Sequence, residues 1–189
     1  MMYLYREWQG TYILPEKQVD GQREKMEYRL GMPSDLDNIC SLVGDAIVEM
    51  EEHGIYQWDE IYPNRNDFEN DIRNNTLYVV NDKGNLIAFY VISRECDEQY
   101  RNGYWMYDEN TAYILHRFCV APKAQNKGVG KEILSHVETQ IKEMGYHSIR
   151  LDVFAENPFA QRLYRHNGYE HRGYADWRKG RFELMEKEI

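Results

Sequence analysis

The most constraining feature of this sequence is a strand that passes through a glycine-containing turn into a long amphipathic helix. Residues 111–120 (TAYILHRFCV) are apolar in both alternating registers, which predicts a central strand covered on both faces. After Pro122 come two glycines, and apolar residues then recur at helical spacing from Val129 to Met144, just before Gly145. A chain built around such a unit is expected to fold as a mixed α/β domain.

The other expected elements lie on both sides of this unit. Strands are predicted at residues 26–31, 76–80, 86–93, 148–154, 169–175 and 182–187. The sequence NDKGN between the second and third of these predicts a hairpin. Helices are predicted at 34–54, after Pro63 and at 157–166, with Ser34 and Asn157 as N-caps. Residues 95–110 are polar and aromatic, which predicts a long loop or an irregular strand pair.

Length and composition favour one domain, residues 26–189, preceded by an N-terminal extension, residues 1–25, that lacks a clean helical or strand period. The 189 residues are 42% hydrophobic, which is enough to bury a core. No segment is long and apolar enough to span a bilayer, and no signal peptide is visible. Three widely spaced cysteines fit a reducing compartment, so a cytoplasmic protein is expected.

Charge excludes some partners and is unevenly distributed. The net charge of −9 argues against a general nucleic-acid binder, and no spacing of His and Cys residues supports a metal site. Residues 34–71 contain eleven acids and one base, whereas residues 121–131 contain three lysines and no acid. The sequence therefore predicts an acidic half together with one small basic segment that suits an anion.

The basic segment, APKAQNKGVGK, has the features of an anion-binding loop. Its glycines allow a tight turn that exposes successive backbone N–H groups, and a helix N-terminus adds about half a positive charge. A Walker A loop requires GxxxxGK[ST], but here Gln125 stands at the first glycine and Glu132 follows Lys131. A dinucleotide fingerprint requires a third glycine, which is missing. The segment therefore matches neither motif, and the expected ligand is a polyphosphate that is bound in another way.

Gln125, Gly128 and Gly130 fit the pattern Gln/Arg-x-x-Gly-x-Gly/Ala, and with it the sequence resembles the GNAT superfamily of N-acetyltransferases. Residues 157–169 (NPFAQRLYRHNGY) are similar to a second signature of that family, N-x-x-A-x-x-x-Y-x-x-x-G-F, with Tyr169 in place of the Phe. The resemblance covers about residues 26–189 in element order.

A further segment, residues 57–63 (QWDEIYP), is similar to one in a bacterial subgroup of the family that has no single settled substrate. The resemblance implies a GNAT-like α/β fold, with a mixed, mostly antiparallel sheet of about six to seven strands and about four helices. It also implies acetyl-CoA as co-substrate and no metal. The residues implied to bind it are Phe118, Cys119, Val120, Gln125, Asn126, Lys127, Gly128, Val129, Gly130, Lys131 and Asn157.

The resemblance implies direct transfer, in which an amine attacks the thioester while both substrates are bound and no acyl-enzyme forms. Positioning of the two reactants then supplies most of the acceleration. Tyr164 stands where the family often has the acid that protonates the leaving thiolate, although it could instead only pack against the substrate. The family often has a basic Glu on the fourth strand, at the position of Ile114 here.

Strand alternation places His116 on the same face as Ile114, which makes it a candidate base; a hydrogen-bonded structural histidine is the alternative. Glu109, Asp59 and Glu60 are lesser candidates. The same alternation places Cys119 on the opposite face from His116. Because no neighbour in the sequence activates its thiol, Cys119 is interpreted as a buried strand residue.

The expected acceptor is the primary amine of a small molecule or peptide. In the family the first two helices border the acceptor groove, and here they carry the local charge of −10, which attracts cationic amines. The rings of Tyr56, Trp58 and Tyr62 could hold a cation or serve as packing. The alternatives are a non-catalytic acyl-CoA-binding module and a transferase for another acyl-CoA. A homodimer is possible, and neither a nucleic acid nor a membrane is an expected partner.

Overall fold

The computed structural model describes residues 26–189, so the predicted extension, residues 1–25, lies outside the described residues. Seven strands form one sheet in the order β1-β2-β3-β4-β5-β7-β6. They are β1 (Glu27–Leu30), β2 (Leu77–Asp82), β3 (Asn85–Ser93), β4 (Ala112–Val120), β5 (Ser148–Phe154), β6 (Glu170–Trp177) and β7 (Gly180–Glu188). All neighbouring strands are antiparallel except β4 and β5. The predicted mixed, mostly antiparallel sheet is confirmed.

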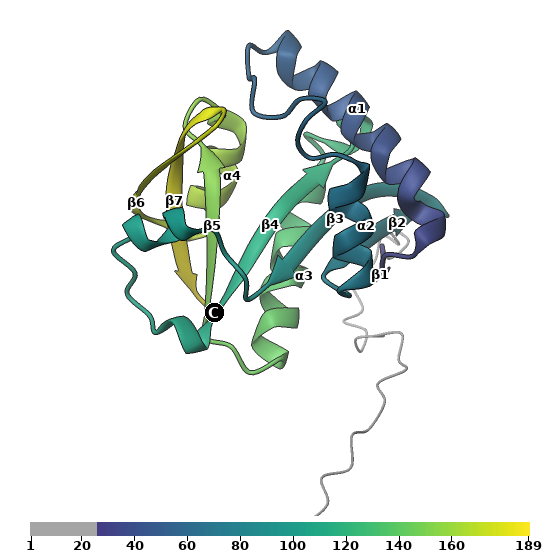
Figure 1. The fold of residues 1–189 in the computed structure, drawn as a ribbon. Helices are drawn as coiled ribbons and strands as arrows, with labels where there is room; N and C mark the ends of the chain where they lie inside the picture. The colour runs from purple at the N-terminus through teal and green to yellow at the C-terminus, as the bar shows by residue number, and fades with distance from the viewer. Residues whose placement is uncertain (1–25) are drawn as a thin grey trace, which may run out of the picture.

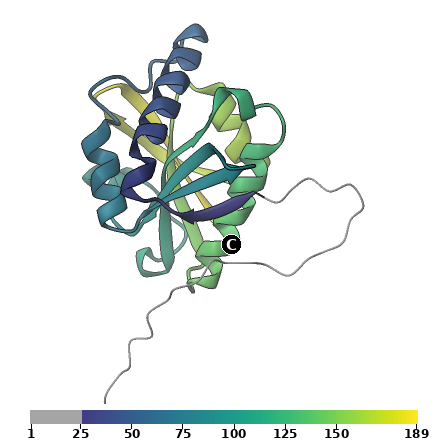
Figure 2. The ribbon, with the colours of Figure 1, turned by 90° about the vertical axis from the view of Figure 1, so that its right-hand side faces the viewer.

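Four helices cover the two faces of this sheet. They are α1 (Leu36–Glu52), α2 (Arg65–Arg73), α3 (Val129–Glu143) and α4 (Pro158–His166). Helices α1 and α2 lie on one face, and α3 and α4 lie on the other (Figure 2). None of the helices within residues 26–189 is long and apolar enough to cross a membrane.

Each face of the sheet has its own core, which the helical spacing of apolar residues creates. On one face α3 buries four fully covered side chains, Ile133, Leu134, Val137 and Ile141. On the other face α1 buries Ile39, Leu42, Val43 and Ala46 against β2 and β3. Leu115 of β4 belongs to the first core and Cys119 to the second, so β4 is covered on both faces, as the apolar sequence of residues 111–120 predicts.

One local prediction needs correction, and one open alternative is resolved. Residues Pro33–Asp35 form a 3-10 turn, so α1 begins at Leu36 and Ser34 is not its N-cap. The Asp35 carboxylate accepts the Met32 N–H at 2.8 Å and pairs with Arg29, and a paired carboxylate is a stronger acceptor than a serine hydroxyl. Within residues 95–110 the structure has 3-10 turns, including η2 (Glu98–Asn102), so the loop interpretation holds and the strand pair does not.

Candidate active site

The sheet opens between β4 and β5. The two strands pair only through their first three residues, up to Ile114 on β4 and Arg150 on β5. Beyond this point they diverge, and the V-shaped gap points towards α1 and α4 (Figure 1). The gap belongs to a cleft of about 1450 Å³ that reaches from the β4–α3 loop to the β6–β7 turn. An extended ligand therefore has both a place to lie and unpaired strand edges to bind.

A bulge in β4 bends the strand at the gap. Phe89 pairs with Cys119 and Val91 pairs with His116, so β4 has one residue more than β3 between these pairs. Arg117, in the bulge, has φ 40°, which is uncommon for a residue other than glycine. Because the extra residue shifts the alternation, Cys119 and His116 lie on the same face of the sheet. The prediction that they lie on opposite faces is therefore wrong.

The bulge is anchored to α2 by a buried ion pair. The Nη2 of Arg117 donates to both carboxylate oxygens of Asp71, at 2.6 and 2.7 Å, and its Nη1 donates to the Tyr62 hydroxyl at 2.8 Å. The Arg117 side chain is 16% exposed and that of Asp71 is 12% exposed. The sequence analysis did not identify this cluster, because its members come from three separate segments.

The edge of β4 that faces the gap presents the main chain of Phe118 and Val120. Ala121 donates its N–H to Ile87 of β3 at 2.8 Å, and successive residues of a strand point their main-chain groups to opposite edges. The Gln125 side chain donates to the Val120 carbonyl at 2.9 Å and so holds the following loop against this edge. The main-chain groups of residues 118 and 120 thus face the gap, and their contact with an extended ligand stays a prediction.

The loop between β4 and α3, here called the anion cradle, has a backbone geometry that suits an anion. Asn126 and Gly128 have φ angles of 58° and 81°, which turn the chain tightly into the helix. Glu132 donates its N–H to the Gly128 carbonyl at 3.1 Å, so the N–H groups of the three residues before it are the available donors at the helix N-terminus. A Cβ added at Gly128 would meet no described atom within 4 Å, so the space in front of the loop is open.

The cleft brings together nearly all of the residues predicted to bind the co-substrate. The two that do not line it are Lys127 and Val129. Lys127 donates to the Lys123 carbonyl at 2.6 Å, and the Val129 side chain packs in the core. Asn157 caps α4 by accepting the Ala160 N–H at 3.0 Å.

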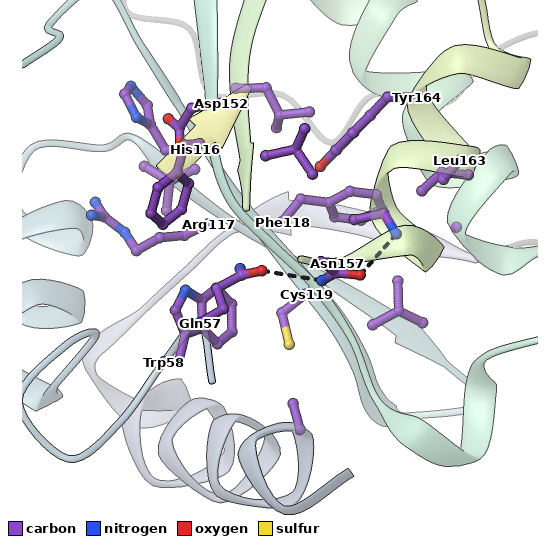
Figure 3. Close-up of a pocket in the computed structure, with 18 of the residues that line it drawn as sticks. Gln57, Trp58, His116, Arg117, Phe118, Cys119, Asp152, Asn157, Leu163 and Tyr164 are labelled. Carbon is purple, nitrogen blue, oxygen red and sulfur yellow. Dashed lines mark hydrogen bonds between the residues drawn. The ribbon is translucent and has the colours of Figure 1, made fainter. Parts of the chain in front are cut away.

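The segment of residues 55–63, here called the strap, connects elements around the cleft. Gln57 accepts a hydrogen bond from the Asn157 side chain at 3.1 Å (Figure 3). Asp59 pairs with Arg178 at 2.7 Å and with Lys179 at 3.2 Å, both in the β6–β7 turn. Together with the bond between Tyr62 and Arg117, these contacts attach the strap to α4, to β4 and to the β6–β7 turn. Hence the QWDEIYP sequence is a structural part of the cleft wall.

Tyr164 extends from α4 into the cleft, and its hydroxyl points towards the gap (Figure 3). The residue is 7% exposed. Burial raises the pKa of its hydroxyl well above that of an ordinary tyrosine, and the nearby charge of Asp152 raises it further. Tyr164 therefore remains protonated at neutral pH and can donate a proton.

His116 also lines the cleft, on β4. Its Nε2 lies 3.1 Å from the Glu95 carbonyl and 3.2 Å from the Ser93 hydroxyl. A carbonyl only accepts, so Nε2 carries a proton in that contact and Nδ1 carries the lone pair. Burial, with a smaller effect of Arg117, lowers the pKa of His116 to about 4, so the ring is neutral at pH 7. The role of His116 as a base stays a prediction.

Cys119 is buried beside α1 and α2. Burial raises the pKa of its thiol to about 12, so the thiolate that a nucleophile requires is scarce at neutral pH. The three lesser candidates for the base do not line the cleft: Glu109, Asp59 and Glu60 are absent from its described wall.

One carboxylate in the cleft escaped the sequence analysis. Asp152, on β5, faces the gap (Figure 3). Its Oδ1 accepts a hydrogen bond from the Tyr100 hydroxyl at 2.7 Å. The signal that could have found it is a single acid in the otherwise apolar second half of SIRLDVF. Burying a carboxylate at such a strand position costs free energy, so the residue is expected to have a partner or a function.

The acidic segment is less negative in space than in sequence. Five of its carboxylates pair with arginines from other parts of the chain or of the segment, in the pairs Asp35–Arg29, Asp37–Arg65, Glu69–Arg65, Asp59–Arg178 and Asp71–Arg117. Within residues 26–189 no group of three His, Cys, Asp or Glu side chains could hold a metal ion. Ion pairing therefore neutralises part of the negative charge of residues 34–71.

The fold and the cleft define a class of α/β proteins whose sheet opens between two parallel strands, with a helix N-terminus at one end of the opening. The sequence matches the acetyltransferase (GNAT) family over residues 44–169, and the chain belongs to this family. The chain is thus an N-acetyltransferase enzyme.

Individual relatives agree with this assignment. The chain is 28% identical over 158 residues to YesJ, an uncharacterized N-acetyltransferase of Bacillus subtilis (strain 168), covering 82% of this chain and 86% of YesJ. Its structure is similar to that of a GNAT acetyltransferase from Streptococcus agalactiae 2603, with a TM-score of 0.77, 25% identity and coverage of 87% and 95% of the two chains.

The fold also matches a structure obtained with a ligand. The PaiA N-acetyltransferase of Thermoplasma acidophilum, solved in complex with coenzyme A, has a TM-score of 0.66 and 20% identity, with coverage of 88% of this chain and 100% of that chain. At this level of identity the likeness concerns the fold alone.

Proposed function

We propose that the chain transfers the acetyl group of acetyl-CoA directly to a primary amine of a cationic small molecule or peptide. The observation that carries this proposal is the continuity of one cleft, which runs from the anion cradle along the open edge of β4 to Tyr164 and Asp152. A donor bound along this path would present its thioester at the wider end of the gap, where an acceptor can enter.

The cradle suits the pyrophosphate of coenzyme A. Its backbone N–H donors, the dipole of α3 and the Lys131 side chain all favour an anion at this position. The open space at Gly128 leaves room for phosphate oxygens close to the backbone. Further along, the Phe118 and Val120 main chain offers hydrogen-bonding groups to the amides of the pantetheine arm.

The other end of the cleft suits an amine. Aromatic rings line it, and a protonated amine is attracted both by ring faces and by carboxylates. These rings belong to Tyr62, Tyr100, Trp177 and Phe182, and the carboxylates to Asp97 and Asp152. The high thiol pKa of Cys119 supports a mechanism in which the amine attacks the thioester itself and no acetyl-cysteine forms. Tyr164 then protonates the departing thiolate of coenzyme A.

Titration calorimetry with acetyl-CoA tests the donor site. Wild-type chain should bind in the micromolar range, and Gly128→Glu should lose binding because its carboxylate would occupy the open space in front of the cradle. Gly128→Lys is the matched control: it carries a long side chain at the same left-handed φ of 81°, with the opposite charge. Equal loss in both variants would indicate a steric or folding effect, and no binding by the wild type would refute the donor site.

Release of the coenzyme A thiol tests transfer. Putrescine, glucosamine and a tripeptide with a free N-terminal alanine represent three kinds of primary amine. Turnover with any of them supports an acetyltransferase with a cationic acceptor. Binding of acetyl-CoA without turnover of any of these amines would favour a non-catalytic acyl-CoA-binding module. Faster turnover with succinyl-CoA than with acetyl-CoA would favour a different donor.

A further inference from the structure

Asp152 lies on β5 at the point where this strand separates from β4. Ile114 of β4 stands opposite Arg150 of β5 at the last paired position before the strands separate. Asp152 is two residues further along β5, so its side chain lies on the same face as that of Arg150, at the edge of the gap. The carboxylate therefore stands beside the opening, close to where β4 carries the apolar Ile114.

The carboxylate is held in place by a hydrogen bond and not by an ion pair within the described part of the chain. Tyr100, from η2, fixes Oδ1 with a hydrogen bond of 2.7 Å. Among residues 26–189 no cation forms an ion pair with Asp152. The nearest guanidinium to influence it, Arg117, is already paired with Asp71. A second carboxylate oxygen thus remains for a group that enters the cleft.

On this basis we propose that Asp152 is the general base of the transfer reaction and that it receives the proton of the acceptor ammonium. This inference rests on the proposed function, since it names the group that prepares the amine for attack. The rival, His116, has Nε2 engaged with a backbone carbonyl, so only Nδ1 could accept a proton. Asp152 is a carboxyl group without a paired cation among the described residues, and in its ionised form it both attracts the ammonium and takes its proton.

The proton balance of the reaction is complete with these residues. The ammonium gives one proton to Asp152, and the nitrogen lone pair forms a bond to the thioester carbonyl carbon, which places a negative charge on the oxygen. The carbonyl then re-forms and the C–S bond breaks, with its electron pair leaving on sulfur. Sulfur takes the proton of Tyr164, the tyrosinate takes the second proton of the nitrogen, and Asp152 releases its proton to water.

The surroundings of Asp152 favour this role. Burial raises the pKa of its carboxyl above the ordinary aspartate value, which brings its proton affinity closer to that of the amine. The charged and titratable groups that face it come from four places. They are Asp97 and Tyr100 beside and within η2, Arg117 on β4, Tyr62 in the strap and Tyr164 on α4.

The test compares Asp152→Asn with wild type, using the best of the three amines and, in parallel, hydroxylamine. Asn keeps an oxygen for the Tyr100 hydroxyl but cannot take a proton, so kcat/KM for the alkylamine should fall by about 100-fold or more. The acidic limb of the kcat/KM pH profile should disappear. Turnover of hydroxylamine, which is largely uncharged at neutral pH and needs no base before attack, should be retained.

Three comparisons make the outcome decisive. Acetyl-CoA affinity and the melting temperature of Asp152→Asn should match those of wild type, and Asp176→Asn, an exposed carboxylate of β6, should leave activity unchanged. Normal alkylamine turnover in Asp152→Asn, or loss of the acidic limb in His116→Gln instead, would overturn the role of Asp152 alone. No turnover of any amine by wild type that binds acetyl-CoA would overturn both the transfer function and this role.

Discussion

Individual residues in the cleft owe their protonation states to burial more than to charged partners. For Tyr164, His116 and Cys119 the largest cause of the pKa shift is removal from water, which disfavours the charged form in each case. The tyrosine and thiol therefore keep their protons, and the imidazole stays neutral. Burial likewise raises the pKa of the Asp152 carboxyl, which accepts a hydrogen bond from Tyr100 and has no ion-pair partner among residues 26–189.

Tyr164→Phe should separate acid catalysis from packing. The ring of phenylalanine fills the same space, so affinity for acetyl-CoA should be unchanged, whereas kcat should fall by about 100-fold because the thiolate leaves without a proton donor. Since the pKa of the Tyr164 hydroxyl is raised, the wild-type kcat should show no decline between neutral pH and about pH 10. A kcat that survives the substitution would assign Tyr164 to packing alone.

Asp71→Asn should destabilise the whole domain. The substitution leaves the buried Arg117 guanidinium without its counter-charge, which costs about 3–5 kcal/mol of unfolding free energy. Urea denaturation measures this loss. Asp37→Asn is the control, because it also removes a carboxylate paired with an arginine, but there the Asp37 side chain is 88% exposed and little change is expected. Equal effects in the two variants would contradict a structural role for the buried pair.

At the scale of elements, the strap depends on pH through Asp59. Arg178 and Lys179, with two backbone N–H groups of the strap, hold the pKa of this carboxyl well below its usual range. A depressed pKa means that the native state favours the charged form. The stabilisation is therefore complete above the ordinary carboxyl range and is lost as the pH falls through that range and below it.

Asp59→Asn should consequently lower the melting temperature at pH 7 and have progressively less effect as the medium is acidified. Melting curves collected from pH 7 down to about pH 3 measure the difference between variant and wild type. Glu98→Gln removes a fully solvated carboxylate from the pair with Arg101 and should leave the curve unchanged. A difference that grows on acidification would contradict the ion pairs of the strap.

The sequence predicts elements well because their signals are local. The glycine turn, the N-cap at Asn157 and the alternation of apolar residues each depend on a few neighbours, and strands and helices lie close to where these patterns predict them. The bulge at Arg117 has no such signal, since HRFCV reads as a regular strand and its extra residue is evident only against β3. The partners Asp71 and Asp59 depend likewise on contacts between distant segments.

In the candidate site too, the parts with local sequence signals could be predicted and the parts that depend on distant segments could not. The cradle could be predicted because a loop and the helix after it form one continuous segment. Asp152 could not be placed at the gap, because the gap results from the limited pairing of β4 with β5, two strands separated by a helix. A catalytic group that depends on how two distant segments meet, such as Asp152 at the gap, can be found only from the structure.

At the scale of the molecule, the sheet consists of a four-stranded part, β1 to β4, and a three-stranded part, β5 to β7. Only three residue pairs connect them along the strands. A ligand in the gap contacts both parts, so binding of acetyl-CoA should stabilise the chain as one unit. At a concentration of 100 times the Kd the gain is about 2.7 kcal/mol, or roughly 5–10 °C in Tm.

Thermal unfolding with and without acetyl-CoA measures this effect. A single, cooperative transition should move upward in the wild type and stay in place in Gly128→Glu, which has lost the cradle. Two transitions, of which one alone responds to acetyl-CoA, would show that the parts of the sheet unfold separately.

The bulge in β4 also has a consequence for how the chain would tolerate the deletion of a residue in evolution. Deleting the single codon for Arg117 would leave every strand and helix of the fold in its order and keep the pairs of His116 and Cys119 with β3, because the residue removed is the extra one. The deletion would instead remove the bend at the gap and the guanidinium that ties β4 to Asp71 and Tyr62. The strand pairing would thus survive the loss of this one residue, whereas the anchor of β4 to α2 and the strap would not.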